Sequence, residues 1–316
     1  MAAILCVSGC SSTSVAIEQP YDVYATAADF GLSSNGTAEA KSYFASDLCV
    51  SEDVAIGTDS TDSQVAEGAG TFNLETNTVV YAKNLYERLY PASTTKILTA
   101  YIALKYCDDL DAMVTVSENA VNQASDSSVC NLKAGDVIRL RDLLYGLMLR
   151  SGNDAAVAIA EYISGDVDSF AALMNQEAAA MGATRSHFVN PNGLPDENHY
   201  TCVYDMYLIF SNAVKNDTFV SIIGTTSYDV TYTDASGEAV THTWENTNQY
   251  LTGNATTPDG FQIVGGKTGT TGEAGYCLVL YSYNPSGQPI ISIVFKADGK
   301  SNLYLLMNEM LQGFAI

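Results

Sequence analysis

A serine and a lysine stand three residues apart at the head of an apolar segment, YPASTTKILTA, residues 90–100. On a helix, Ser93 and Lys96 would lie on the same face, one turn apart. A serine hydroxyl becomes a good nucleophile when a neighbouring base takes its proton, and a lysine with a lowered pKa can be that base. Pro91 suits a helix start, which would place Ser93 near the positive end of the helix dipole. The same residues would also fit a helix cap followed by a surface lysine.

A second polar group separates two apolar segments that favour helices. Ser151-Gly152-Asn153 lies between LLYGLML and DAAVAIAEYI. Short polar side chains at such a boundary are typical caps, so Asn153 or Asp154 is expected to cap the second helix. The same group can also present a hydroxyl and an amide to a cleft beside Ser93.

A third group, Lys267-Thr268-Gly269, lies within IVGGKTGTTGEAGY. The residues on both sides have high strand propensity, so the group is expected on a β-strand. The spacing G-x-x-x-x-G-K-[ST] of a phosphate-binding loop is absent. Alone, the segment could be a glycine-rich edge strand with an exposed lysine. Its glycines would allow a ligand to approach the backbone closely; they are Gly265, Gly266, Gly269 and Gly272.

The three groups occur in the order S-x-x-K, S-x-N and K-T-G, which is the signature shared by penicillin-binding proteins and serine β-lactamases. From about Gly70 to its end, the chain resembles the low-molecular-mass penicillin-binding proteins, the serine-type D-alanyl-D-alanine carboxypeptidases. The resemblance implies an α+β, β-lactamase/transpeptidase-like fold, in which an antiparallel five-stranded sheet packs against a helical cluster. The active site would lie in the groove between them. The matching segments include VVYAKN, YPASTTKILTA, LLYGLMLRSGNDAAVAIAEYISG, HFVNPNGLPDENHYT, WENTNQYL and GGKTGTTGEAGYCLV.

By this resemblance, Ser93 is the nucleophile that attacks the carbonyl between the two terminal D-alanines of a peptidoglycan stem pentapeptide. The resulting acyl-enzyme would then be hydrolysed by water. Lys96 is implied as the general base for Ser93. Ser151 would relay a proton to the leaving amine, and Asn153 would hold the substrate amide and help to position Lys96.

The resemblance also implies that the K-T-G strand binds the substrate. Lys267 would face the terminal carboxylate of the peptide, and Thr268 and Thr270, which flank Gly269, would offer hydroxyls to it. The backbone N–H groups of Ser93 and Thr270 would form an oxyanion hole. Many relatives carry histidine at the position of Thr270, which leaves the role of that side chain open. β-Lactam antibiotics are the expected inhibitors, and neither a metal nor a cofactor is expected.

Other activities are compatible with parts of this pattern. A DD-endopeptidase that cuts peptidoglycan cross-links would share the machinery and differ in the shape of its cleft. A class A β-lactamase needs E-x-x-L-N between the second and third motifs, and Glu197 does not stand in that pattern. A non-catalytic wall-binding or sporulation protein is disfavoured because every expected catalytic residue is present. A metallopeptidase is disfavoured because His187, His199 and His242 form no H-E-x-x-H motif.

Strand-like segments near both ends of the chain, with helical segments between them, predict one α+β catalytic domain over residues 69–316. Its sheet should join the two ends. Two β-like runs in residues 69–84 predict a hairpin. Helices are expected from STTKILTAYIALKY to VYDMYLIFSNAV, then strands from SYDVTYT to PIISIVFKA, and a last helix in SNLYLLMNEML. Residues 11–68, which are rich in Ser, Thr and Asp, predict a leader or tether.

The first ten residues, MAAILCVSGC, contain a short apolar run that ends at Cys10 and resembles a lipoprotein lipobox. No Lys or Arg precedes the run, and it is shorter than a usual signal, so a signal truncated at its start is expected. We therefore expect an enzyme of the cell envelope, outside the cytoplasm, whose attachment to the membrane depends on a lipid on Cys10.

Charge and cysteine content exclude several other classes of protein. The chain has 14 basic and 36 acidic residues and a net charge of −22. Such a surface repels nucleic acid and anionic lipid headgroups, so neither is an expected partner. The cysteines form no C-x-x-C pair, so neither a zinc knuckle nor a dense disulfide scaffold is indicated.

Overall fold

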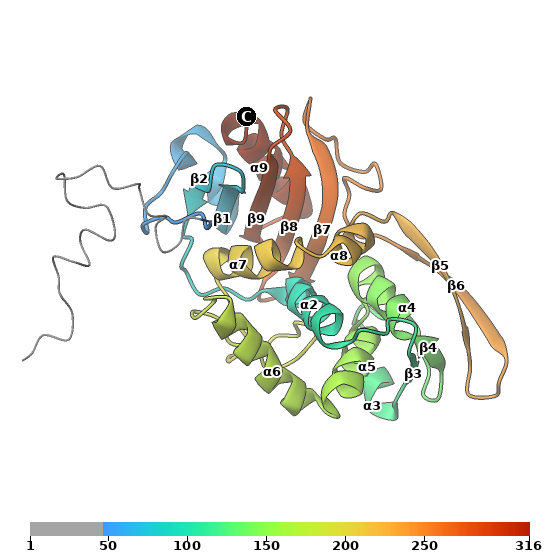
Figure 1. Ribbon diagram of the computed structural model, residues 1–316. Helices are drawn as coiled ribbons and strands as arrows, with labels where there is room; N and C mark the ends of the chain where they lie inside the picture. The colour runs from blue at the N-terminus through green and yellow to red at the C-terminus, as the bar shows by residue number, and fades with distance from the viewer. Residues whose placement is uncertain (1–46) are drawn as a thin grey trace, which may run out of the picture. The chain divides into compact units, whose positions relative to one another are not determined.

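A five-stranded antiparallel sheet is the centre of the computed structural model, which describes residues 47–316 (Figure 1). Its strand order is β2-β1-β9-β8-β7, so the hairpin at the start of the domain pairs with the last strand of the chain. This confirms the predicted α+β fold and a sheet that joins the two ends. The strands are β1 (Ala66–Asn73), β2 (Thr78–Lys83), β7 (Gln262–Thr271), β8 (Gly275–Tyr283) and β9 (Pro289–Ala297).

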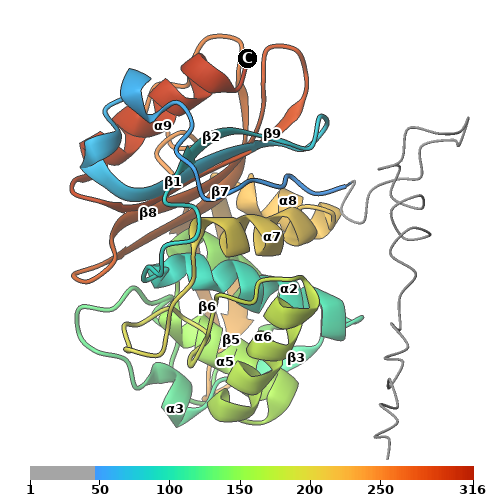
Figure 2. The same cartoon turned by 90° about the vertical axis from the view of Figure 1, so that its left-hand side faces the viewer.

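The sheet is covered on both faces. The C-terminal helix α9 (Lys300–Phe314) lies on one face and the other α-helices lie on the opposite one (Figure 2). Along β8, Leu278 and Leu280 pack in the cluster that contains α9, whereas Cys277 and Val279 pack in the cluster on the other face. A strand that is buried on both faces needs consecutive apolar residues, and the segment CLVL of β8 is such a run.

The helical layer comes from the middle of the chain, and α2 contacts several of the other helices. The sequence predicted one helix over LRDLLYGLML, but the structure divides this segment into an α-helix and a π-helical turn. The elements of this layer are η3 (Ala92–Thr95), α2 (Lys96–Tyr106), α3 (Glu118–Val121), α4 (Leu140–Tyr145), the π-helical η4 (Gly146–Arg150), α5 (Asn153–Ser164), α6 (Val167–Ala180), α7 (Val203–Ala213) and α8 (Asp217–Ile223).

A smaller sheet of four strands, in the order β3-β4-β5-β6, lies beside the helical layer of the described chain (Figure 1). β5 and β6 form the expected hairpin, with Gly237 at a φ of 89° in its turn. β3 and β4 were not predicted, because three residues are too few to show an alternating pattern. The strands are β3 (Met113–Thr115), β4 (Val137–Arg139), β5 (Ser227–Thr233) and β6 (Ala239–Glu245).

Residues 47–65 belong to the packed structure, although their composition suggested a leader. Cys49 is fully buried, and its N–H donates a hydrogen bond to the Tyr207 hydroxyl. Ile56 forms a β-bridge with Ala82 of β2. The expected domain start at residue 69 therefore falls inside β1, because polar composition does not exclude a few apolar anchors. Two 3-10 turns precede β1, η1 (Thr58–Ser60) and η2 (Ser63–Val65).

The lipobox and the first part of the expected leader, residues 1–46, lie outside the described residues. In residues 47–316, no helix has the length and hydropathy that crossing a membrane requires.

Candidate active site

Ser93 lies in the 3-10 turn η3, between the sheet and the helices, and α2 begins at Lys96. Ser93 therefore precedes the α-helix by a short turn and does not open it. Its side chain makes no capping hydrogen bond, which excludes the alternative that Ser93 is only a helix cap. Ala92 has a φ of 48°, a left-handed conformation that costs a β-carbon residue about 1 kcal/mol or more. The backbone just before Ser93 is therefore strained.

Lys96 is fully buried and its amine contacts three groups. Its Nζ lies 3.0 Å from Ser93 Oγ, 2.8 Å from Asn153 Oδ1 and 2.6 Å from the carbonyl oxygen of Asn192. Burial, and then the nearby charge of Lys267, hold the pKa of Lys96 well below its usual range. Both effects disfavour the charged form of an amine, so Lys96 can become neutral in the folded protein.

Ser151 follows the π-helical turn with a φ of 63°, and α5 begins two residues later at Asn153. The N-cap residue of α5 is Gly152, so neither Asn153 nor Asp154 stands at the cap position, although Asp154 Oδ1 accepts from the N–H of Ala155 at 2.9 Å in the first turn of the helix. Asn153 uses its side-chain oxygen to accept from Lys96 instead. Asp154 accepts from the backbone N–H groups of Cys130 and Leu132, which secures the neighbouring loop.

Lys267 lies on β7, an edge strand of the five-stranded sheet, as the sequence predicted. It is buried, and its Nζ donates to Ser151 Oγ at 3.0 Å and to the carbonyl of Thr268 at 2.8 Å. Burial lowers the pKa of Lys267 to about 7. The alternative of an exposed lysine on an edge strand is therefore wrong.

At two glycines of β7, the space that a side chain would fill is occupied by backbone atoms of other segments of the protein. The sequence suggested that a ligand would approach there. A β-carbon at Gly265 would lie 2.3 Å from the carbonyl oxygen of Ile223, at the end of α8. A β-carbon at Gly269 would lie 3.0 Å from the backbone nitrogen of Ser93. Gly269 thus lets β7 approach η3, and this approach brings the K-T-G segment beside Ser93.

The loop NPNGLP, residues 190–195, supports Lys96 from behind and was not recognised as part of the site. Besides the carbonyl of Asn192, the carbonyl of Pro191 accepts from Thr99 of α2 at 2.7 Å. A β-carbon at Gly193 would lie 1.9 Å from the carbonyl oxygen of Ala92. The loop therefore presses directly against the strained turn that carries Ser93.

His199 joins this loop to the turn η3. Its Nε2 lies 2.8 Å from Thr95 Oγ1, and its Nδ1 accepts from the backbone N–H of Val189 at 3.1 Å. Since Nδ1 is an acceptor, Nε2 carries the proton and donates to the threonine. Burial lowers the pKa of His199 to about 4, so the imidazole is neutral at physiological pH. The histidine serves as a structural link, in agreement with the absence of a metal-binding motif around it.

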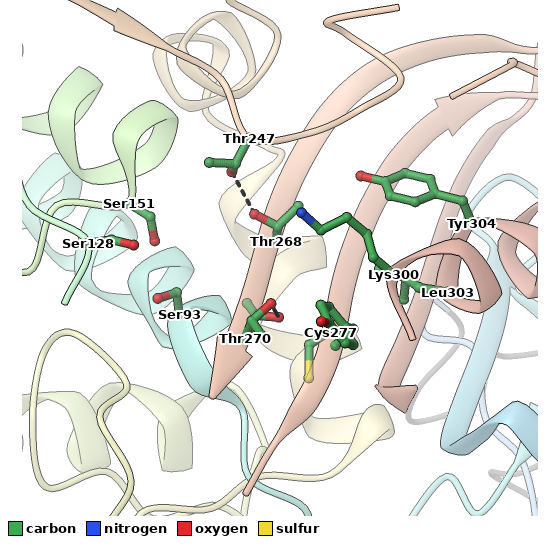
Figure 3. Close-up of a pocket in the computed structure, with 12 residues that line it drawn as sticks. Ser93, Ser128, Ser151, Thr247, Thr268, Thr270, Cys277, Lys300, Leu303 and Tyr304 are labelled. Atoms are coloured by element: carbon green, nitrogen blue, oxygen red, sulfur yellow. Dashed lines mark hydrogen bonds between the residues drawn. The ribbon is translucent and has the colours of Figure 1, made fainter. Parts of the chain in front are cut away.

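Two cavities meet at Ser93. One, of about 160 Å³, has Thr268, Gly269 and Thr270 in its wall together with Ser151 (Figure 3). The other, of about 400 Å³, extends past Asn153 and the loop at residues 192–195. The structure therefore brings all the predicted site residues to one cleft or its immediate wall.

Several further residues border the first cavity and were not singled out from the sequence, among them Thr247, Ser128 and Lys300. Thr247 Oγ1 lies 2.6 Å from Thr268 Oγ1. Ser128 lies across the cavity from β7, and the amine of Lys300 points from α9 toward Thr268 (Figure 3). Thr247 stands in WENTNQYL, a segment that the family resemblance included, but nothing in its spacing distinguished it. Lys300 comes from a helix that the sequence placed only as the end of the fold.

No cluster of three His, Cys, Asp or Glu side chains able to hold a metal ion occurs within residues 47–316. The cysteines of this region are all free thiols. The chemistry available in the cleft is therefore that of hydroxyls, amines, amides and backbone N–H groups.

Comparison with protein families and known proteins gives consistent results. Residues 57–299 match a family model described as D-alanyl-D-alanine carboxypeptidase. A D-alanyl-D-alanine carboxypeptidase of Streptomyces sp. strain K15 is 34% identical over 265 residues, which cover 79% of this chain and 88% of that protein. The D-alanyl-D-alanine carboxypeptidase DacF of Bacillus subtilis strain 168 is 34% identical over 251 residues. That match covers 78% of this chain but only 61% of the Bacillus protein.

Solved structures show the same similarity. The crystal structure of the Streptomyces K15 DD-transpeptidase has a TM-score of 0.73 and 33% sequence identity, and the match covers 80% of this chain and 98% of that one. The D-alanyl-D-alanine carboxypeptidase DacD from Francisella tularensis has a TM-score of 0.69 and 27% identity, with 89% and 74% of the two chains covered.

Proposed function

Since the chain belongs to the D-alanyl-D-alanine carboxypeptidase family, we propose that it removes the terminal D-alanine from peptidoglycan stem peptides through an acyl-enzyme on Ser93. The observation that carries this proposal is the contact between two buried lysines and two serines of the cleft. Lys96 Nζ lies 3.0 Å from Ser93 Oγ, and Lys267 Nζ lies 3.0 Å from Ser151 Oγ.

The partners of Lys96 support its role as the general base. A neutral amine has two N–H bonds and one lone pair. The side-chain oxygen of Asn153 and the carbonyl of Asn192 can each accept one N–H. The third contact of the amine is Ser93 Oγ, so the lone pair of the neutral amine faces the hydroxyl whose proton it must take. The lowered pKa of Lys96 favours this neutral form.

Acylation then follows from the arrangement of β7. Ser93 Oγ bonds to the carbonyl carbon of the peptide, and the carbonyl oxygen becomes an oxyanion. The backbone N–H groups of Ser93 and Thr270 are the proposed donors to it, supported by the close approach of Gly269 to the Ser93 nitrogen. When the intermediate collapses, the C–N bond breaks and Ser151 passes a proton to the leaving amine. Lys267, hydrogen-bonded to Ser151, can replenish that proton and regain one from solvent, while Lys96 returns its proton to Ser93 Oγ when water hydrolyses the ester and releases a proton to solvent.

The first cavity is the proposed site of the leaving D-alanine. Its carboxylate would meet the hydroxyls of Thr268 and Thr270 and the positive charge of Lys267, with Lys300 as a second cation. Thr247 holds the Thr268 hydroxyl in place. The second cavity, which Asn153 borders, would receive the D-alanine that stays bonded to Ser93 as an ester, until water hydrolyses the ester and restores the free hydroxyl.

Release of D-alanine tests the proposal. The purified protein is expected to liberate free D-alanine from diacetyl-Lys-D-Ala-D-Ala and from muropeptide monomers, as mass spectrometry of the products would show. Conversion of cross-linked dimers to monomers, with no D-alanine released, would indicate an endopeptidase instead. Hydrolysis of penicillin with no action on either peptide would indicate a β-lactamase.

Penicillin should also label the enzyme covalently at Ser93. A fluorescent penicillin followed by peptide mapping locates the adduct, and Ser93→Ala should abolish it. Label retained in the Ser93→Ala protein would show that another residue is the nucleophile.

We further propose that the enzyme acts in the cell envelope and is tethered there by a lipid on Cys10. The support is the sequence Val7-Ser8-Gly9-Cys10, which lies outside the described residues. The mass of the N-terminal peptide of the mature protein tests the tether. A diacylglyceryl group on Cys10 is expected, and a mature protein that starts at another residue would overturn it.

A further inference from the structure

A trough of about 630 Å³ opens from the proposed active site across the end of the large sheet. It begins at Thr270, which also borders both cavities at Ser93. It continues past Tyr276 of β8 and Lys296 of β9 and ends at Glu67 of β1. The trough is thus continuous with the cleft and is not needed by any step of the proposed reaction.

The strand register gives the length of this trough. Thr270 pairs with Tyr276, Tyr276 pairs with Ala297, and Ala297 pairs with Ala66, so these residues form one row across four strands. Neighbouring strands lie about 4.8 Å apart. The row therefore reaches from β7 to β1 over three spacings, or about 14 Å.

A β-bulge brings Lys296 into the wall of the trough. The register between β8 and β9 shifts between Tyr276 and Leu278, so that Phe295 and Lys296 both stand opposite Cys277, and Lys296 has a φ of 56°. Val294 and Ala297 consequently pack in the same cluster although they are three residues apart. Bulges beside active sites commonly redirect a side chain, and a lysine with positive φ is strained. The strained backbone conformation thus occurs at the residue whose side chain lines the trough.

The polar groups of the trough are suited to an uncharged ligand that is rich in hydroxyls. Lys296 Nζ lies 2.7 Å from Glu67 Oε1, so these two charges largely cancel. Both side chains remain substantially exposed, and Asp298 adds a second carboxylate. Carboxylates accept hydrogen bonds from hydroxyls, the ammonium donates to hydroxyl or amide oxygens, and Tyr276 combines an apolar ring with a hydroxyl. Together these groups match the surface of an N-acetylated sugar.

We propose that the far end of the trough, at Lys296 and Glu67, is a subsite for the saccharide that carries the stem peptide of the substrate, and that the stem itself crosses the strand ends between Thr270 and this subsite. This inference rests on the proposed function. Four residues of a stem pentapeptide lie on the acyl side of the bond between its last two residues. Fully extended, four residues span about 14 Å. A stem that starts at Ser93 beside Thr270 and runs across the strand ends therefore brings its sugar to Lys296 and Glu67.

The test compares kcat/KM for three substrates: diacetyl-Lys-D-Ala-D-Ala, the free stem pentapeptide, and the same pentapeptide on its disaccharide. The disaccharide substrate is expected to exceed the free pentapeptide by about tenfold, mainly through a lower KM. In Glu67→Ala and in Lys296→Asn this ratio should fall to near one. Asparagine is chosen because it tolerates positive φ. Glu75→Ala removes an exposed carboxylate in the β1 to β2 turn and should keep the wild-type ratio.

The outcomes separate this subsite from the proposed function. A wild-type ratio near one, with the short substrates still cleaved, would overturn the subsite alone. So would a gain that is already complete with the free pentapeptide and is lost in both variants, because Lys296 and Glu67 would then bind the peptide and not the saccharide. If no substrate releases D-alanine, the proposed function fails. Binding of the saccharide is then measured without catalysis, by titrating the free disaccharide into the protein and following the Tyr276 resonances by NMR. No change in chemical shift, or the same change in Lys296→Asn, would refute the subsite.

Discussion

Lys267 Nζ lies 3.0 Å from Ser151 Oγ, although 116 positions separate the two residues and they stand on opposite walls of the cleft. The buried amine of Lys96 contacts Ser93 at the same distance. Burial lowers the pKa of both amines, and the charge of Lys267 lowers that of Lys96 further. The cleft therefore contains two lysines whose charged forms are disfavoured, each beside its own serine.

Lys96→Arg should abolish acylation of Ser93 by penicillin. Arginine stays protonated at any pH the protein tolerates, so it cannot take the serine proton. The expected loss in acylation rate is about 10⁴-fold. Stopped-flow measurements with a fluorescent penicillin would follow this rate across pH. In the wild type, the rate should rise with pH through the lowered pKa of Lys96 and level off above it, because the base must be neutral.

Lys105→Arg is the matched control for this substitution. Lys105 also lies on α2, but its side chain is 44% exposed and pairs with Glu177. Its replacement should leave both the rate and the pH profile of acylation unchanged. A Lys96→Arg enzyme that is acylated at nearly the wild-type rate would show that Lys96 is not the base.

The free energy of unfolding should rise with pH between about pH 7 and pH 9.5, in part because of Lys267. The pKa of Lys267 is about 7 in the folded protein, against 10.5 for an ordinary lysine. Between these values the unfolded chain binds more protons, so raising the pH favours the folded state, by up to about 1.4 kcal/mol per pH unit. Below pH 7 both states are protonated and this contribution stops changing.

Urea denaturation of the wild type and of Lys267→Met at several pH values measures this contribution. The methionine variant should show a smaller rise of stability with pH, since Lys96 is then the remaining buried amine of the cleft. Equal slopes in the two proteins would mean that Lys267 keeps an ordinary pKa in the folded state.

Side chains with distinctive chemistry could be predicted from the sequence, and so could the elements that carry them. Ser93, Lys96, Ser151 and Lys267 each stand in a short motif, and the order of those motifs is informative even without a structure. The long strands of the large sheet were predictable for a similar reason, because nine or ten residues give a clear pattern. Neither signal depends on contacts between distant parts of the chain.

The rest of the site depends on such contacts and could not be predicted. The carbonyl of Asn192 is a backbone group, and any residue type at position 192 could supply it. The left-handed φ of Ala92 could not be predicted from its residue type, because alanine rarely adopts this conformation. Thr247 becomes important only because β7 brings Thr268 within 2.6 Å of it. Each of these features arises when elements far apart in the sequence pack together.

Thr247→Val should weaken the binding of peptides that end in a free carboxylate. The change removes the partner of the Thr268 hydroxyl and keeps the shape of the side chain. A lost hydrogen bond of this kind costs about 1 kcal/mol, so kcat/KM for diacetyl-Lys-D-Ala-D-Ala should fall roughly three- to tenfold, mostly through KM. Thr241→Val is the control, because Thr241 bonds Thr231 at 3.0 Å on the exposed β5 to β6 hairpin. An equal effect of both changes would exclude a specific role for Thr247.

Gly193→Ala should disable the site, whereas Gly165→Ala should not. Both glycines have nearly the same left-handed φ, 88° and 87°, so both alanines bear a similar backbone cost of about 1 kcal/mol. Their surroundings differ: a β-carbon at Gly193 would lie 1.9 Å from the carbonyl oxygen of Ala92, and one at Gly165 would meet nothing within 4 Å. The extra clash should cost on the order of 3 kcal/mol and push η3 away from the loop that holds Lys96.

Chemical denaturation and penicillin acylation, measured on the same two variants, separate the two effects. Gly165→Ala should lose about 1 kcal/mol of stability and keep its acylation rate. Gly193→Ala should lose more stability and, under conditions where it remains folded, acylate far more slowly, because Asn192 can no longer hold the Lys96 amine toward Ser93. If the two folded variants acylate equally fast, contact between the NPNGLP loop and η3 does not position the base, and Asn153 alone would have to orient Lys96.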